Sequence, residues 1–257
     1  PRSTLFPYTT LFRAVASMED IVTTFQNICC YSVYSHQNEI KNGFVTMGSG
    51  HRVGICGTAV SIHGEINSVR DISSLNIRIA REIPNASEEL LRRVGKLDGG
   101  LLIVGMPCSG KTTILRDLAR RISLGIDCRI MRTSVVDERS ELSGTYAGIS
   151  KNDLGLADIL NGYSKADGIM QALRTLSPEA IICDEIGASS DMQAIEQGVN
   201  AGVSIIATIH AESYHELLSR NQGKALIGTG AFKTIVILDS RENVGKIKEL
   251  IRLRGAK

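Results

Sequence analysis

The chain contains no tryptophan, and aromatic residues make up only 4% of its 257 residues. Few side chains are therefore available for stacking on bases, which argues against a platform for single-stranded nucleic acid. Lys and Arg number 29 against 27 Asp and Glu, so the net charge is +2 and no strongly basic surface is predicted. The sequence also lacks an apolar run of membrane-spanning length and a secretory signal.

The Cys-x-x-Cys motif is absent as well. The six cysteines, at positions 29, 30, 56, 108, 128 and 183, show no Cys-x-x-Cys pattern. Many zinc sites and dithiol redox motifs depend on that pattern. We therefore expect free, buried thiols in a reducing cytosol.

The first thirteen residues, PRSTLFPYTTLFR, differ in composition from the rest of the chain. They contain two prolines and three aromatic residues but no acidic residue. We interpret residues 1–13 as a non-native, adapter-like segment and leave them out of the fold prediction. A short basic targeting arm is the alternative interpretation. With the first interpretation, part of the N-terminal domain is expected to be missing.

Residues 14–95 are predicted to form the remaining part of a small α+β N-terminal domain and a linker. Short apolar runs alternate with glycine-containing turns, as in RVGICGTAV, GEINSV and SLNIRIA. This pattern is typical of a β-rich region. Residues 85–97 have the apolar spacing of a helix with Ser87 as its cap, and we expect this helix to link the two domains.

From residue 96 to residue 257, predicted strands alternate with predicted helices. The expected strands are 100–105, 128–138, 179–185, 203–210 and 233–240, and the expected helices between them are 111–123, 166–177 and 191–202. Such alternation predicts an α/β domain with a mostly parallel sheet and helices on both faces.

A phosphate-binding loop follows the first strand of this region. The segment GMPCSGKTT has the pattern G-x-x-x-x-G-K-T, and it lies between an apolar strand and a helix. Its backbone N–H groups would surround phosphate oxygens, the lysine would reach the β- and γ-phosphates, and the first threonine would ligate Mg²⁺. The predicted cofactors are ATP and Mg²⁺, bound by Gly105, Met106, Pro107, Cys108, Ser109, Gly110, Lys111, Thr112 and Thr113.

Acidic residues follow two other predicted strands. In EAIICDEIG, residues 180–183 are expected to enter the sheet, and Asp184 and Glu185 emerge at its carboxyl edge. Asp184 would hold Mg²⁺ and Glu185 would polarise the attacking water. The segment VVDERSE places Glu138 and Glu141 near the same edge, with a solvated loop as the alternative.

A third strand, in ATIH, ends on Thr208 and His210. A polar side chain at this position can sense the γ-phosphate. A single histidine more often has a structural role. We assign His210 to the site because polar residues follow three predicted strands, whose ends are expected to meet.

The segments GMPCSGKTT, VVDERSE, ALRTLSPEAIICDEIG and SIIATIHAES together resemble the secretion-ATPase superfamily, which powers type II and type IV secretion and pilus motors. Within it, SSLNIRIARE, VVDERSEL and SPEAIICDEIG are similar to the stage III sporulation AA family of endospore-forming bacteria. The resemblance covers about residues 45–257. One difference is Asp184, since secretion ATPases usually have glycine before the Walker B glutamate.

This resemblance implies a RecA-like ATPase core behind a small N-terminal domain. It further implies a homo-oligomer, a hexameric ring, on the cytoplasmic side of a membrane. Its partners would be membrane proteins of a channel between mother cell and forespore. The resemblance also favours Glu185 as the catalytic carboxylate, although Glu138 and Glu141 remain candidates.

A ring ATPase needs a cation to stabilise the charge of the transition state, often supplied by a neighbouring subunit. Arg78 and Arg81 precede the core, while Arg139 and Arg174 lie within it. The sequence does not choose among these four. The predicted function is an ATP-hydrolysing motor. The alternatives are a ring ATPase that acts on nucleic acid and a nucleotide-dependent scaffold with little turnover.

Overall fold

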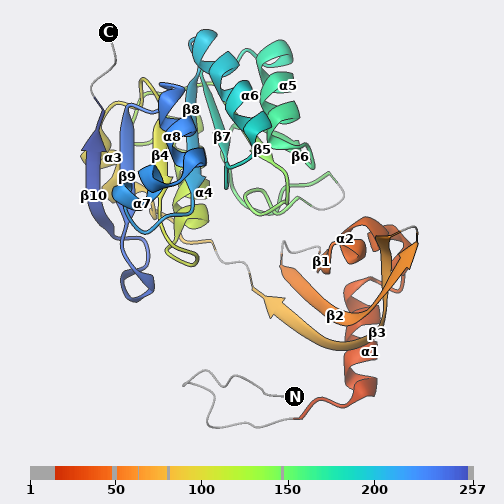
Figure 1. Cartoon of the computed structure of the whole chain (residues 1–257). Coiled ribbons are helices and arrows are strands. Elements are labelled where there is room, and N and C mark those ends of the chain that lie inside the picture. Colours follow the sequence, from red (N-terminus) through yellow and green to blue (C-terminus); the bar gives the residue numbers. More distant parts are fainter. Residues whose placement is uncertain (1–14, 48–50, 63, 80–81, 146–147, 254–257) are drawn as a thin grey trace. The chain divides into compact units, whose positions relative to one another are not determined.

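The computed structural model describes residues 15–47, 51–62, 64–79, 82–145 and 148–253, and it divides the chain into two compact units at residues 80 and 81 (Figure 1). The segment 1–13 lies outside the described residues, so its interpretation stays a prediction, as does the domain boundary at residue 95. None of the helices in the described ranges combines the length and the apolar composition that a membrane crossing requires.

The first unit is a small α+β structure. Its antiparallel sheet has the order β1-β2-β3, formed by β1 (Phe44–Thr46), β2 (Arg52–Ile62) and β3 (Glu65–Arg78). Three helical segments accompany it: α1 (Met18–Ile28), η1 (Val33–His36) and α2 (Gln37–Lys41). The core gathers apolar side chains of α1, α2 and the sheet, among them Phe25, Ile28, Ile40, Val45, Val53 and Ile72.

The second unit contains a seven-stranded sheet with the order β10-β9-β4-β8-β7-β5-β6. All neighbouring pairs are parallel except the edge pair β10–β9. The strands are β4 (Leu101–Val104), β5 (Thr133–Asp137), β6 (Asp158–Asn161), β7 (Ala180–Cys183), β8 (Ser204–Ile209), β9 (Thr234–Leu238) and β10 (Ile247–Arg252). The helices are α3 (Glu88–Val94), α4 (Lys111–Leu124), α5 (Lys165–Thr175), α6 (Ser189–Asn200), α7 (Tyr214–Ser219), α8 (Asn221–Gly228) and the short η2 (Arg241–Asn243).

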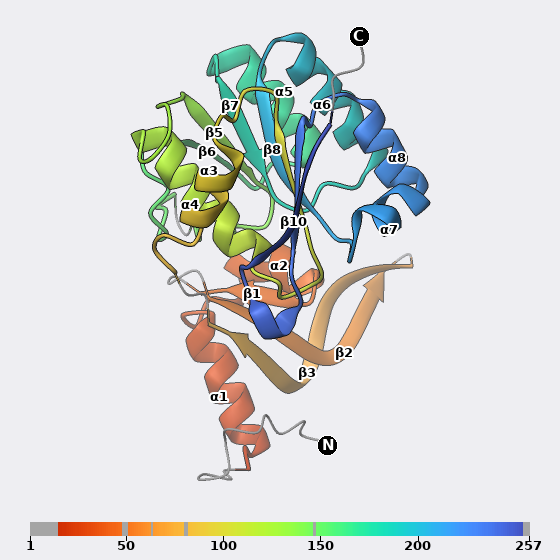
Figure 2. The ribbon, with the colours of Figure 1, turned by 90° about the vertical axis from the view of Figure 1, so that its left-hand side faces the viewer.

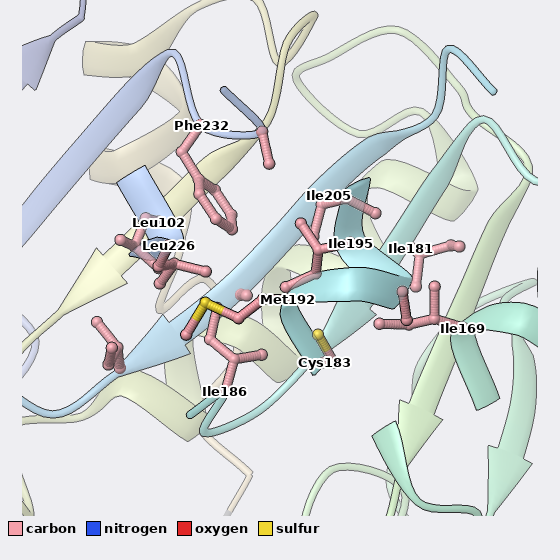
Figure 3. Close-up of a cluster of buried hydrophobic side chains, with 14 of the residues drawn as sticks. Leu102, Ile169, Ile181, Cys183, Ile186, Met192, Ile195, Ile205, Leu226 and Phe232 are labelled. Carbon is pink, nitrogen blue, oxygen red and sulfur yellow. The ribbon is translucent and has the colours of Figure 1, made fainter. Parts of the chain in front are cut away.

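Helices cover both faces of this sheet, as Figure 2 shows with α3 and α4 on one side and α6 and α8 on the other. Successive strand residues point to opposite faces. In β4, Leu101 and Ile103 therefore join the core beneath α3 and α4, whereas Leu102 and Val104 join the core beneath α5, α6 and α8. Figure 3 shows the latter core, in which Met192 and Ile195 of α6 pack near Ile205 of β8. The predicted α/β fold is confirmed.

Some local predictions differ from the structure. The strand expected at 128–138 begins only at Thr133. The helix expected at 85–97 is the shorter α3, and it packs its apolar face into the second unit. Ser87 does not cap α3 through its side chain, because its hydroxyl donates to Asp117 Oδ2 of α4 at 2.6 Å.

All six cysteines lie among the described residues and are free. The expectation that they are buried is wrong for Cys30, Cys56 and Cys108, which are exposed. Cys30 sits in the turn after α1 and Cys108 in the loop before α4, where no neighbouring layer covers them. Cys56 belongs to the part of β2 that remains open to solvent.

Candidate nucleotide and magnesium site

The phosphate-binding loop lies at the carboxyl edge of the central strand β4. In the strand order, β5 lies on one side of β4, and the chain reaches it from β4 through α4. The strand β9, which follows β8 in the chain, lies on the other side of β4. The crevice where connections diverge in this way is where open α/β sheets bind ligands. β8 and β7 end beside the loop, so the three segments predicted from the sequence meet at this edge.

The loop has the shape of an anion cradle. Gly110 has φ +95°, and a Cβ atom there would come 3.1 Å from the backbone nitrogen of Gly245. That nitrogen donates to the carbonyl of Ser109 at 2.9 Å, which ties the loop between β9 and β10 to the phosphate-binding loop. Ser109 Oγ is buried without a hydrogen-bond partner among the described residues. A loop with an unsatisfied donor at a helix N-terminus fits a phosphate group.

Lys111 is the first residue of α4, and only 4% of it is exposed. Its Nζ donates to the carbonyls of Gly105 at 2.8 Å and Met106 at 2.9 Å, and it lies 3.0 Å from His210 Nδ1. Burial lowers the pKa of Lys111, against the opposing effect of the carboxylates of Asp184 and Glu185. The ammonium group is therefore held inside the loop, where a triphosphate would enter.

The two predicted magnesium ligands are in direct contact. Thr112 Oγ1 donates to Asp184 Oδ2 at 2.6 Å, and the hydroxyl of Thr208 donates to the other carboxylate oxygen. Burial raises the pKa of Asp184, against these two hydrogen bonds, which lower it. A hydroxyl and a buried carboxylate are hard oxygen ligands of the kind Mg²⁺ takes beside substrate phosphates, so this pair fits the cofactor.

Glu185 follows the strand β7 in a conformation that is uncommon for a side-chain-bearing residue. Its φ is +50°, and its backbone N–H donates to Thr208 Oγ1 at 2.8 Å. Consecutive strand residues point to opposite faces, but β7 ends at Cys183. In the left-handed conformation, the side chain of Glu185 no longer follows the alternation of the strand. Such uncommon conformations persist where surrounding contacts hold them.

His210 connects the lysine of the loop to this glutamate. His210 Nε2 lies 2.7 Å from Glu185 Oε1, while Nδ1 faces the Lys111 ammonium group. Because an ammonium can only donate, Nδ1 accepts, and Nε2 carries the proton that goes to Glu185. Arg139 Nη1 lies 3.6 Å from the other oxygen of Glu185. Burial would raise the pKa of Glu185, but the His210 hydrogen bond and the nearby cations lower it below its ordinary value.

The acidic segment after β5 borders the same region. A pocket is lined by the first residue of α5, Lys165, and by residues of both strand ends, including Asp137, Glu138, Arg139, Glu141, Asp184 and Glu185. Asp137 is buried and accepts hydrogen bonds from the backbone N–H groups of Glu141 at 2.9 Å and Ser143 at 2.7 Å. The carboxylate of Asp137 thus shapes the turn that presents Glu138 and Arg139 to the pocket.

The structure does not bring all predicted arginines to this site. Arg174 lies exposed in the last turn of α5, which leads to the start of β7 and so to the opposite, amino edge of the sheet. Arg78 ends β3 in the first unit, and Arg81 lies outside the described residues. Among the described residues of the second unit, Arg139 contacts another predicted site residue, Glu185, whereas Arg174 does not. Roles for the others in a neighbouring subunit stay predictions.

The described part of the site contains cations that were not predicted from the sequence, among them Lys165 and Arg220. Lys165 of α5 pairs with Glu138, and Arg220 Nη1 donates to the carbonyl of His210 at 2.8 Å. Arg220 follows α7, at the break between α7 and α8, and it holds the end of β8 in place. Neither residue lies within a recognised sequence motif. The sequence offered only one indication of their role, which is that a region rich in carboxylates needs positively charged partners.

Cys108 is expected to be the most reactive of the six thiols. It is exposed with φ +65° in the loop before α4, where an alkylating reagent can reach its sulfur and where bound ATP would cover it. By contrast, burial raises the pKa of Cys183 to about 12. Mass spectrometry after brief alkylation should show Cys108 labelled first and protected by ATP. The exposed Cys30 and Cys56 are the internal controls, and equal labelling of all three without protection would contradict the prediction.

Comparison with known proteins places this geometry in context. A model of the family described as "Sporulation stage III, protein AA" matches residues 10–257. Stage III sporulation protein AA of Bacillus subtilis is 38% identical over 235 residues, covering 90% of this chain and 76% of that protein.

Two solved structures share the fold. The X-ray structure of the ATPase DotB from Yersinia pseudotuberculosis aligns with a TM-score of 0.56 at 18% identity, over 87% of this chain and 64% of that one. DotB from Legionella pneumophila gives a TM-score of 0.52 at 14% identity, over 88% and 65%. The chain therefore spans less than two thirds of either DotB structure. At these identities the likeness concerns the fold alone, which this chain shares with the two DotB ATPases.

Proposed function

The chain belongs to the family of sporulation stage III, protein AA, and from this premise we propose that it is an ATP-hydrolysing motor of the secretion-ATPase type. The observation that carries the proposal is a line of contacts from Lys111 through His210 to Glu185. These three residues follow β4, β8 and β7 and lie at the same edge of the sheet. This line joins a group suited to bind the γ-phosphate with a group suited to activate water.

Binding of ATP would rest on the loop 105–113. The backbone N–H groups and the N-terminus of α4 face the phosphates, and Lys111 exchanges its contacts with two loop carbonyls for contacts with phosphate oxygens. Thr112 and Asp184 would hold Mg²⁺, which when bound neutralises phosphate charge. Thr208 keeps Asp184 in place through its hydroxyl.

In the hydrolysis step, Glu185 accepts a hydrogen bond from the attacking water and orients its oxygen toward the γ-phosphorus. The water oxygen bonds to that phosphorus while the bond from the phosphorus to the β–γ bridging oxygen breaks. The water gives up a proton to Glu185, which then releases it to solvent, and ADP and inorganic phosphate form. His210 contacts both Glu185 and Lys111, so the loss of the γ-phosphate would be felt at the end of β8. Arg139 is placed to offset charge on Glu185 or on the phosphate.

We further propose that the protein works as a homo-oligomeric ring, a hexamer by analogy with the superfamily. A neighbouring subunit would supply a further arginine, with Arg78, Arg81 and Arg174 as candidates. The ring would act in the cytoplasm on the mother-cell side, docked on membrane proteins of a sporulation channel.

The test is ATP turnover measured against assembly state, with and without DNA. We expect phosphate release to rise with the oligomeric fraction and to be unaffected by DNA. Stimulation by DNA would instead favour a ring ATPase that acts on nucleic acid. Negligible turnover in an assembled ring would favour a nucleotide-dependent scaffold, and either result would overturn the proposal.

A further inference from the structure

We propose that Lys165 is a positioning residue of the site, which fixes Glu138 at the edge of the catalytic pocket and thereby controls the hydrolysis step rather than ATP binding. The inference rests on the proposed ATPase function. Lys165 Nζ contacts Glu138 Oε2, and both side chains line the pocket shared with Asp184 and Glu185.

Close packing of α5 explains why Lys165 stands over this pocket. Gly168 lies one turn further along α5, and a Cβ atom there would come within 2.4 Å of Val136 Cγ1 of β5. Residues three apart share one helix face. The missing side chain at Gly168 lets the start of α5 approach β5 closely, which directs Lys165 toward the carboxyl end of the same strand.

The placement of Lys165 is costly for a lysine of merely structural role. Its side chain is only 12% exposed, and it is the first residue of α5, where the helix dipole disfavours a positive charge. A lysine with little access to water needs a carboxylate partner. We explain this arrangement by a requirement for a cation next to Glu138.

That requirement follows from the charges around the pocket. Glu138 and Glu185 lie on adjacent parallel strand ends, and each is paired with a different cation, Lys165 and Arg139 respectively. Without Lys165, the charge of Glu138 would stand uncompensated beside Glu185 and the entering γ-phosphate. Both carboxylates line one pocket, and like charges in one pocket repel, so Glu138 would leave its position and the lining of the pocket beside Glu185 would change.

The experiment compares Lys165→Met, Glu138→Gln, the double variant and Lys165→Arg, with the exposed Lys96→Met as control. Methionine keeps length and removes the charge. We expect Lys165→Met to lower kcat about 10-fold with ATP affinity within about 2-fold, the pattern of an interaction that acts on the chemical step. The double variant should be no slower than Glu138→Gln, and Lys165→Arg should restore most of the activity.

Several outcomes would overturn the inference: an unchanged kcat in Lys165→Met, rate losses that multiply in the double variant, or a loss confined to ATP affinity. Melting temperatures of the wild type, Lys165→Met, Glu138→Gln and the double variant measure the Lys165–Glu138 coupling without catalysis, and additive changes would also contradict it. If the wild type releases no phosphate, the proposed function fails, and the inference is then judged on the melting temperatures.

Discussion

Replacing Lys111 by alanine is expected to weaken ATP binding by at least about 100-fold, or about 2.8 kcal/mol, and to abolish turnover. Lys111 is 4% exposed, and its Nζ lies inside the loop within 3.0 Å of two carbonyl oxygens and of His210 Nδ1. Hydrogen bonds from a cation to phosphate are among the strongest that a protein makes. The variant loses these bonds and leaves the negative charge of the triphosphate without its main partner in the loop.

Two matched variants separate charge from packing. Lys111→Met fills the same buried space without charge, so it should bind ATP as weakly as the alanine variant. Lys96→Ala removes an exposed lysine before β4, at the opposite edge of the sheet, and should bind ATP like the wild type. Binding is measured by titration with a fluorescent ATP analogue, and folding by circular dichroism. Wild-type affinity in a folded Lys111→Ala protein would refute the assignment of the phosphate-binding loop.

The sequence was sufficient to predict the arrangement near the phosphate-binding loop, because the relevant signals are local. β7 covers Ala180–Cys183 as predicted, and Asp184 and Glu185 emerge at its carboxyl edge. The strands β4, β8 and β9 are buried along almost their whole length and consist mainly of apolar residues, as expected for a sheet covered on both faces. Motif spacing and burial pattern therefore fixed both the sheet type and the edge that carries the site.

Other features depend on contacts between distant segments and left no local signal. The edge strand β6 is four residues long and partly exposed, so it lacks the apolar run that marks a buried strand. Ser87 has the sequence position of a helix cap, but its hydroxyl donates a hydrogen bond to the carboxylate of Asp117, thirty residues away. Lys165 faces Glu138 only because Gly168 lets α5 approach β5. Pairings of this kind require the tertiary structure.

Three glutamates compete for the catalytic role, and the geometry separates them. Glu185 contacts His210 at 2.7 Å and Arg139, and through His210 it is linked to Lys111. Glu138 pairs with Lys165 at the side of the pocket. The backbone of Glu141 is held in the turn around Asp137. Glu185 contacts His210, which in turn contacts Lys111, and this arrangement supports a role for Glu185 in orienting water.

Glu185→Gln is therefore expected to lower kcat about 100- to 10,000-fold, the range for loss of a positioned acid or base, while ATP still binds. Glutamine keeps the size of the side chain and, like glutamate, must adopt the left-handed backbone conformation with φ +50°. It cannot carry the negative charge that polarises water. The hydrogen bond from His210 can still form to the amide oxygen, so the loop, the Lys111 position and ATP affinity should change by no more than about 3-fold.

The measurement compares ATP affinity and turnover for Glu185→Gln, Glu138→Gln and Glu141→Gln, with the exposed Glu196→Gln of α6 as control. We expect the control to match the wild type and the variants at 138 and 141 to retain more activity than the variant at 185, because their carboxylates act through neighbouring groups. Near-wild-type hydrolysis by Glu185→Gln, together with a large loss in either of the other two, would move the catalytic role to the segment after β5. In that case the contact between His210 and Glu185 would serve to hold the end of β8 rather than to activate water.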